Sequence, residues 1–223
     1  MKFLTKKRVV LFLLFIFPLI CFLILSTGQN NFTKLPVLTE NVLDVSEISE
    51  SKTSTFKERV SVVCFLGEDI EKSKTRLLNV NEKIYKKFID FKQFQIIAIY
   101  PSEKEVAVAE LKKQIGAFTD MKNWVFVPSE KEMIQTLFHS FKTDEFLENF
   151  GSSNAFIIDK NGNLRGRIDD KDAENGKLYG YDMNAVAVLK DKLKDDINVL
   201  YYEYYAAFKD KNKNKADRKE VGL

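Results

Sequence analysis

One apolar run, followed at once by a helical pattern, constrains the fold of this 223-residue chain more than any other feature. Residues 60–66 read Val-Ser-Val-Val-Cys-Phe-Leu and are bounded by Arg59 and Gly67. Such a run is typical of a strand in the centre of a sheet that is covered on both faces. After Gly67, apolar residues recur at three- and four-residue spacing, which predicts a helix over about residues 70–91.

The same alternation of strand and helix continues toward the C-terminus. The order is βα, βα, βα, a β-hairpin and a final helix, and strands that alternate with helices require parallel crossovers. The Asn161-Gly162 turn makes the last two strands antiparallel. We therefore predict an α/β fold, a mixed sheet with helices on both faces. The predicted strands are 94–100, 124–127, 154–159 and 163–169, and the predicted helices are 102–116, 129–141 and about 182–209.

The N-terminus has the features of a membrane anchor. Residues 9–25 are apolar throughout and follow Lys2, Lys6, Lys7 and Arg8. This arrangement predicts one transmembrane helix with a cytoplasmic N-terminus. A signal peptide cleaved near residues 26–28 is the alternative. We divide the chain into an anchor or signal peptide (1–28), a polar tether (29–57), a domain (58–209) and a charged, frayed tail (210–223).

The residue inventory excludes several function classes. The formal charge of +3 gives no reason to expect a nucleic-acid partner. Cys21 and Cys64 fall in the apolar N-terminal run and in the central strand, so we expect no disulfide between them. His139 is the only histidine, and no CxxC pair exists, so a metal site of Cys and His lacks enough ligands. We therefore predict no catalytic residue, no metal site and no cofactor.

The chain resembles the thioredoxin superfamily and, within it, the Sco/SenC group of membrane-anchored copper-delivery proteins for cytochrome oxidase. The resemblance rests on the anchor and tether, the strand, loop and helix at 60–91, the hairpin at 155–165, and the long last helix. In that family a CxxxC motif lies in the loop that here runs from Gly67 to Lys74, and a metal-binding His precedes the fourth strand. This chain has neither, since residues 151–154 are Gly-Ser-Ser-Asn. The resemblance thus implies a divergent member without the copper ligands.

Together these features predict a binding or assembly module in the bacterial inner membrane, with its domain on the periplasmic side. Its partners would be the membrane, through residues 9–25, and an envelope or membrane protein. The resemblance suggests an oxidase subunit and a role in cytochrome oxidase biogenesis. The alternative is a thiol oxidoreductase or peroxidase that acts through Cys64. A copper carrier with unconventional ligands is a third hypothesis.

Two places in the domain are candidate sites. Glu68, Asp69 and Glu71 follow the central strand, where open α/β sheets bind ligands; they can hold a hard cation or simply begin a solvated helix. The second place is a mixture of charged and aromatic residues after the hairpin, which we interpret as a partner surface or, more simply, as a charged edge strand. The residues of this second place are Arg165, Arg167, Asp169, Asp170, Tyr179, Tyr181 and Asp182.

Overall fold

The computed structural model describes residues 6–26, 33–49, 54–173 and 175–220, and the chain divides into two compact units, Met1–Thr33 and Lys34–Leu223. In the first unit, α1 (Lys6–Ser26) is helical through Pro18, and its large apolar side chains from Val10 to Ile24 are exposed. No helix in the described part of the chain is both long and apolar enough to cross a membrane. The alternative cleavage site lies mostly outside the described residues, because positions 27 and 28 are not among them.

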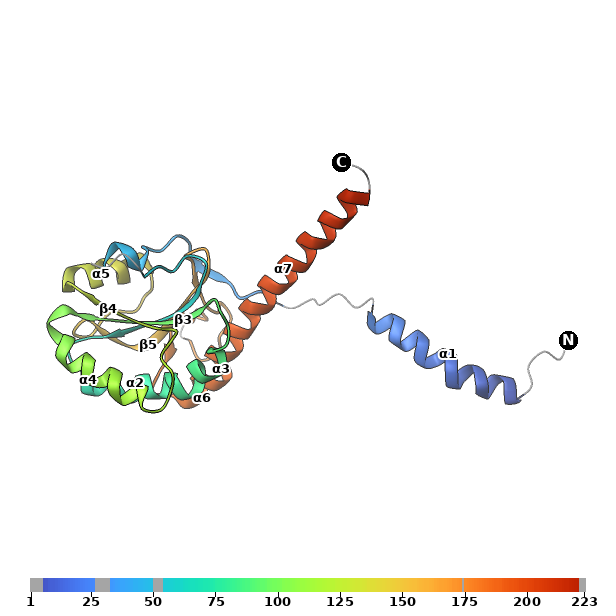
Figure 1. Cartoon of the computed structure of the whole chain (residues 1–223), viewed down its shortest axis with the longest axis horizontal. Coiled ribbons are helices and arrows are strands. Elements are labelled where there is room, and N and C mark those ends of the chain that lie inside the picture. The colour runs from blue at the N-terminus through green and yellow to red at the C-terminus, as the bar shows by residue number, and fades with distance from the viewer. Residues whose placement is uncertain (1–5, 27–32, 50–53, 174, 221–223) are drawn as a thin grey trace. The chain divides into compact units, whose positions relative to one another are not determined.

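The second unit is built on a mixed sheet whose order is β1-β6-β5-β2-β3-β4 (Figure 1). The three neighbouring strands β2, β3 and β4 are parallel, β5 is antiparallel to β2, and β6 and β1 continue antiparallel. A short strand, β7, also pairs with β5. The predicted mixed sheet is confirmed. The strands are β1 (Val37–Thr39), β2 (Val60–Leu66), β3 (Phe94–Pro101), β4 (Trp124–Ser129), β5 (Gly151–Ile158), β6 (Leu164–Arg165) and β7 (Tyr181–Asp182).

The helices fall in the predicted order, and two of them contain π-helical turns. Asn81–Tyr85 is a π-helical segment between α2 (Ile70–Val80) and α3 (Lys86–Phe88), and Leu189–Leu193 is another between α6 (Val186–Val188) and α7 (Lys194–Glu220). Short 3-10 turns lie at Val45–Glu47 and Ser102–Lys104. The remaining helices are α4 (Glu105–Gly116) and α5 (Lys131–Ser140).

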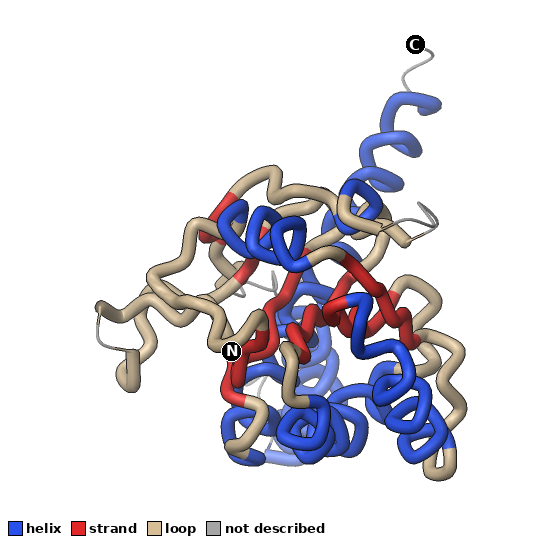
Figure 2. The backbone as a smooth tube through the Cα atoms, turned by 90° about the vertical axis from the view of Figure 1, so that its left-hand side faces the viewer, coloured by secondary structure: helices blue, strands red, loops and turns tan. Residues whose placement is uncertain are grey.

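Helices cover both faces of the sheet. In Figure 1, α2, α3, α4 and α6 lie on one side of the strands and α5 lies on the other, and Figure 2 shows the strands between these two layers. Along β2 the side chains alternate between the two layers, as the pleat of a strand requires. Val62 and Cys64 pack toward the layer of α2, α4 and α7, whereas Val63 and Phe65 pack toward the layer of α5.

The compact domain begins earlier in the chain than its predicted start at residue 58. β1 pairs with β6, and Val42, Val45, Ile48 and Phe56 are buried in the core on the α5 side. The interpretation of residues 29–57 as a tether is therefore wrong from Leu35 onward within the described residues. The apolar residues of this segment are spaced irregularly among polar ones, so no helix or strand period revealed their burial.

Two further boundaries differ from the prediction. α7 continues to Glu220 instead of fraying after Lys209, because residues 209–220 contain no Gly or Pro that would end a helix. β6 has two residues, where a strand over 163–169 was predicted. The reason is that β5 pairs with β6 only at Ile157 and Ile158, and with β7 at Asn154 and Ala155.

Candidate functional site

The carboxyl end of the central strand β2 meets the segment that leads into β5. β2 ends at Leu66, and α2 begins at Ile70 after a three-residue loop. The Asp69 side chain accepts a hydrogen bond from the Lys72 backbone N–H at 2.9 Å and so caps α2. Across from this loop runs the segment 144–154, which follows α5 and includes the first residues of β5.

Glycine is required where these two segments touch. Gly67 has a φ of +70°, and a Cβ on it would lie 2.8 Å from backbone atoms of Asn149 and Gly151. A Cβ on Gly151 would meet the backbone of Leu66 and Gly67 at 3.0 Å. The backbone N–H of Glu68 donates to the Asn149 carbonyl at 3.1 Å. The direct contact of the two backbones therefore depends on the absence of a side chain at both positions.

A tight two-residue turn at the pocket holds residues in an uncommon backbone conformation. Glu148 and Gly151 exchange two backbone hydrogen bonds of 2.9 Å, and the residues between them, Asn149 and Phe150, have φ values of 46° and 63°. Asn adopts this left-handed region readily, whereas a bulky residue such as Phe150 rarely does. The Lys131 ammonium lies 5.3 Å from the centre of the Phe150 ring. Strained residues of this kind cluster at functional sites.

Between the β2 loop and the 144–154 segment lies a pocket of about 480 Å³. Carboxylates dominate its charged lining, with five acidic against two basic side chains. Phe146, which is 83% exposed, is also part of the lining. Carboxylates on the rim make the potential negative where a ligand would approach. The charged lining residues are Glu68, Asp69, Asp144, Glu145, Glu148, Lys72 and Arg76.

Most of these charges have a partner inside the protein. Glu145 accepts a hydrogen bond from Asn154 Nδ2 at 2.9 Å. Burial raises the pKa of the Glu145 carboxyl above its ordinary value, and the hydrogen bond from Asn154 opposes this shift. Arg76 donates to Asn184 Oδ1 at 3.3 Å, and Lys72 lies 3.4 Å from a Glu148 oxygen. Glu145 is therefore a half-buried acid among exposed ionic groups.

Cys64, the cysteine of the second unit, does not line the pocket. Cys64 lies on β2, is 0% exposed and packs in the core on the α2 side. Burial raises the pKa of the Cys64 thiol to about 12, so at neutral pH it stays protonated and shielded from reagents. This environment disfavours the alternative of a thiol oxidoreductase or peroxidase acting through Cys64.

The hard-cation interpretation of the β2 loop has no support in the geometry. Asp69 caps α2, and Glu68 contacts the Lys131 ammonium at 2.5 Å. Within the described residues, no group of three or more His, Cys, Asp or Glu side chains is arranged to hold a metal ion. His139 is exposed near the end of α5. The acids of the loop thus serve the helix terminus and an ion pair.

The structure separates the seven residues of the predicted partner surface. Arg165, Asp170 and Tyr181 are buried, at 7%, 6% and 0% exposure, and so are not available to a partner. Arg167, Tyr179 and Asp182 are half-buried, and Asp169 is exposed. A role in partner binding stays a prediction for those four residues.

Four of the seven residues instead fasten the hairpin and the following loop to α7 and to the π-helical segment Leu189–Leu193 before it. Arg167 donates to both Asp196 carboxylate oxygens, at 2.7 and 2.9 Å, and the Tyr181 hydroxyl donates to Asp196 at 2.6 Å. Lys192 donates to Asp170 at 2.6 Å. Arg165 reaches Glu203, two helical turns beyond Asp196, so both arginines bind carboxylates of α7.

The sequence indicated the β2 loop as a place for binding, but it did not indicate the other wall of the pocket. Asp144, Glu145, Phe146 and Glu148 lie about 80 residues away along the chain in a segment without regular structure. One available signal was the Gly-Ser-Ser-Asn run at 151–154, which begins β5, the strand beside β2. Because β5 runs antiparallel to β2, its first residues must lie at the carboxyl end of β2.

Comparison with known proteins gives likeness of fold only. No protein-family model and no curated protein matches the sequence. Among solved structures, apo Sco1 from Thermus thermophilus is 13% identical with a TM-score of 0.46, and covers 77% of this chain and 100% of its own. A SCO1/SenC family lipoprotein from Bacillus anthracis is 14% identical with a TM-score of 0.44, over 77% and 99% of the two chains.

A thiol:disulfide interchange protein of the thioredoxin family from Chlorobium tepidum is 12% identical with a TM-score of 0.43, over 71% of this chain and 97% of its own. At these values the likenesses assign neither a family nor an activity. The fold itself is thioredoxin-like by its own topology: parallel β2, β3 and β4, an antiparallel β5–β6 hairpin beside β2, and helices on both faces.

Proposed function

We propose that this protein is a binding module that receives a segment of a partner protein in the pocket at the carboxyl end of β2, and that it uses neither thiol nor copper chemistry of its own. The observation that carries the proposal is the pocket itself, about 480 Å³ between the Gly67 loop and the 144–154 segment. Open α/β sheets bind ligands outside the carboxyl ends of their strands. The buried, high-pKa thiol of Cys64 speaks against an enzyme that acts through this residue.

The lining favours a positively charged partner segment. Five carboxylates against two basic side chains attract a cation and repel an anion at the pocket mouth. Phe146 offers an exposed ring on which a guanidinium can stack. The occupant we propose is therefore an extended protein segment that contains Arg or Lys.

The cellular setting is proposed from the sequence. The apolar run 9–25 follows four basic residues, and its large side chains from Val10 to Ile24 are exposed along α1. Both features support attachment to the bacterial inner membrane with the domain on the periplasmic side. The resemblance to the Sco/SenC group supports a partner in cytochrome oxidase assembly. Carbonate extraction and protease protection of the full chain test the attachment and the orientation.

Photo-crosslinking tests the pocket. We replace Phe146 with the photoreactive residue p-benzoylphenylalanine and compare it with the same replacement of Phe118, which is 68% exposed after α4 and outside the pocket lining. We expect a crosslinked partner from position 146 and not from position 118, and its loss in the double variant Asp144→Lys/Glu148→Lys. The same crosslinks from both positions, or crosslinks that survive the double variant, would contradict the proposal.

Complementation separates binding from thiol chemistry. In a strain that lacks the chromosomal gene, we expect reduced cytochrome oxidase activity, restored by the wild type and by Cys64→Ala but not by Asp144→Lys/Glu148→Lys. Immunoblotting controls for protein level. Unchanged oxidase activity in the deletion strain would refute the oxidase role. Failure of a stably expressed Cys64→Ala would favour the thiol enzyme.

A further inference from the structure

The outer side of the middle turns of α7 carries exposed aromatic side chains. Tyr202, Tyr205 and Phe208 are 65%, 68% and 64% exposed. They are spaced three residues apart, so they follow one side of the helix. The C-terminal turns of α7, which follow this row, project beyond the body of the domain (Figures 1 and 2). Large aromatic side chains in such a row are a common mark of an interaction surface.

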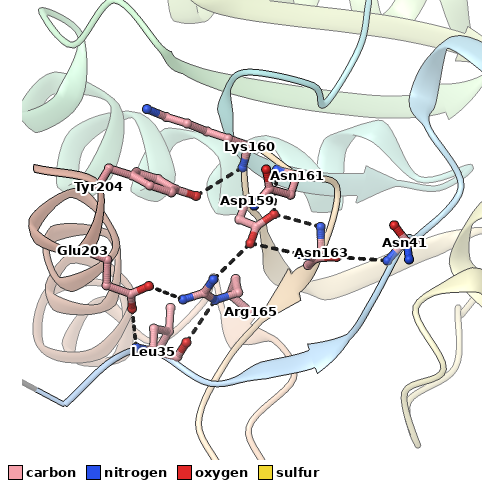
Figure 3. Close-up of polar contacts among 9 residues, drawn as sticks. All are labelled: Leu35, Asn41, Asp159, Lys160, Asn161, Asn163, Arg165, Glu203 and Tyr204. Atoms are coloured by element: carbon pink, nitrogen blue, oxygen red, sulfur yellow. Dashed lines mark hydrogen bonds and ion pairs between the residues drawn. The ribbon is translucent and has the colours of Figure 1, made fainter. Parts of the chain in front are cut away.

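The inner side of the same turns is already occupied by the domain. The Tyr201 ring lies 4.6 Å from the Phe91 ring, and the Tyr204 hydroxyl accepts a hydrogen bond from the Lys160 N–H at 3.2 Å. Glu203 accepts from Arg165 at 2.6 Å (Figure 3). These contacts fix the rotation of α7, so the exposed aromatic residues cannot turn inward without breaking a buried ion pair.

The N-terminal part of the chain reaches the domain at this same turn. The Leu35 N–H donates to Glu203 Oε1 at 2.5 Å, and the Leu35 carbonyl accepts from Arg165 Nε at 3.0 Å (Figure 3). α1 ends at Ser26, nine residues before Leu35. A chain of nine residues spans at most about 30 Å. Whatever surface holds residues 9–25 is therefore within reach of the α7 aromatic residues.

The residues that follow the aromatic row complete the chemistry of a lipid interface. Residues 209–220 contain six basic side chains and three acidic ones. Tyrosine is enriched where a membrane meets water, and clusters of Lys and Arg are attracted to anionic lipid headgroups. We propose that Tyr202, Tyr205 and Phe208, with the basic residues of 209–220, dock α7 onto an anionic lipid surface. This inference rests on the proposed membrane attachment through residues 9–25.

An environment-sensitive label on the full chain tests the docking. In a Cys21→Ala background, where Cys64 is buried, we introduce Tyr205→Cys or Phe208→Cys and attach acrylodan. Phe118→Cys, at an equally exposed position, is the control. Vesicles of phosphatidylcholine with and without phosphatidylglycerol are the membrane. We expect a blue shift in emission at 205 and 208 with phosphatidylglycerol only, lost at about 1 M salt, where the Debye length falls to about 3 Å. We expect none at 118.

Flotation of the same samples separates this inference from the proposed attachment. If the chain floats with both vesicle types while labels 205 and 208 behave like label 118, the docking is overturned and the attachment stands. If the chain floats with neither, both are overturned. A blue shift that appears without vesicles and grows with protein concentration assigns the face to a second copy of the chain and overturns the lipid proposal.

Discussion

Arg165 donates from Nη1 to Oδ2 of Asp159 at 3.0 Å, although both side chains are buried, with 8% and 0% exposed. The same guanidinium binds Glu203 on α7 and the Leu35 carbonyl (Figure 3). One side chain therefore joins the β5–β6 hairpin, the last helix and the segment that enters β1. Asp159 also accepts backbone hydrogen bonds from Asn161 and Asn163, so the hairpin turn is part of this cluster.

Removal of this guanidinium should destabilise the fold strongly. Arg165→Met leaves two carboxylates without their cation, and breaking a buried ion pair in this way costs about 3–5 kcal/mol. Urea denaturation followed by circular dichroism measures the loss. Lys86→Met, which breaks an exposed pair with Glu82, is the control and should lower the free energy of unfolding by less than about 1 kcal/mol. Equal effects would contradict the structural role of Arg165.

Substitutions in the cluster that Asp196 forms with Arg167 and Tyr181 should also affect folding. If Arg167 and Tyr181 lay on an exposed partner surface, their replacement by Ala would spare the fold. Because Tyr181 is 0% exposed, its truncation should instead lower the free energy of unfolding by about 3–5 kcal/mol. Tyr181→Phe removes only the hydrogen bond to Asp196 and should cost about 1.5–3 kcal/mol. A wild-type urea midpoint for Tyr181→Ala would show that the side chain is not packed as described.

Glycine at position 58 should stabilise the domain. Glu58 is exposed and has a φ of 63°, a left-handed conformation that costs a side chain about 1–2 kcal/mol and glycine almost nothing. We expect Glu58→Gly to raise the free energy of unfolding by about 1 kcal/mol. Glu110→Gly, in the middle of α4, should lower it by about 1 kcal/mol. Urea denaturation measures the change in the free energy of unfolding for both variants, and the two changes should have opposite signs.

Neutralising Glu145 should stabilise the protein in a pH-dependent way. Burial raises the pKa of this carboxyl in the folded state, so the native protein holds the proton more tightly than the unfolded chain does. Stability is therefore lost as the pH rises through the folded-state pKa. Glu145→Gln should match the wild type below about pH 4 and exceed it at about pH 7. The exposed Glu110→Gln is the control, and the reverse pH trend would refute the assignment.

Thiol labelling should distinguish the cysteines. Because Cys64 is buried and its thiol has a pKa of about 12, iodoacetamide at pH about 8 should leave it unmodified in the native protein and modify it after denaturation in urea. Peptide mass spectrometry locates the label and separates Cys64 from Cys21, which is partly exposed. Rapid native modification of Cys64 would revive the thiol-enzyme hypothesis.

Local sequence patterns accounted for the elements with a strong period. The runs at 60–66, 94–100 and 124–127 are strands, and the helical stripes after them are helices, because burial on a pleated or helical surface requires the matching spacing of apolar residues. The hairpin at Asn161-Gly162 follows from the positive φ that Gly162 adopts. Elements without a period could not be predicted. β1 and β7 are short, and only their partners in the sheet define them.

The sequence by itself determined the order of strands and helices, the burial of β2 and the place where the β2 loop opens, since each depends on neighbours along the chain. Only the tertiary structure decided the roles of charged residues. Arg165 and Tyr181 look like surface anchors in sequence, yet α7 supplies Glu203 and Asp196 from 38 and 15 residues away and encloses them. The wall of the pocket at Glu145 and Phe146 likewise depends on a contact between backbones at Gly67 and Gly151. Whether a charged side chain is buried or exposed depends on partners that are distant in the chain. The spacing of neighbouring residues in the sequence does not reveal those partners.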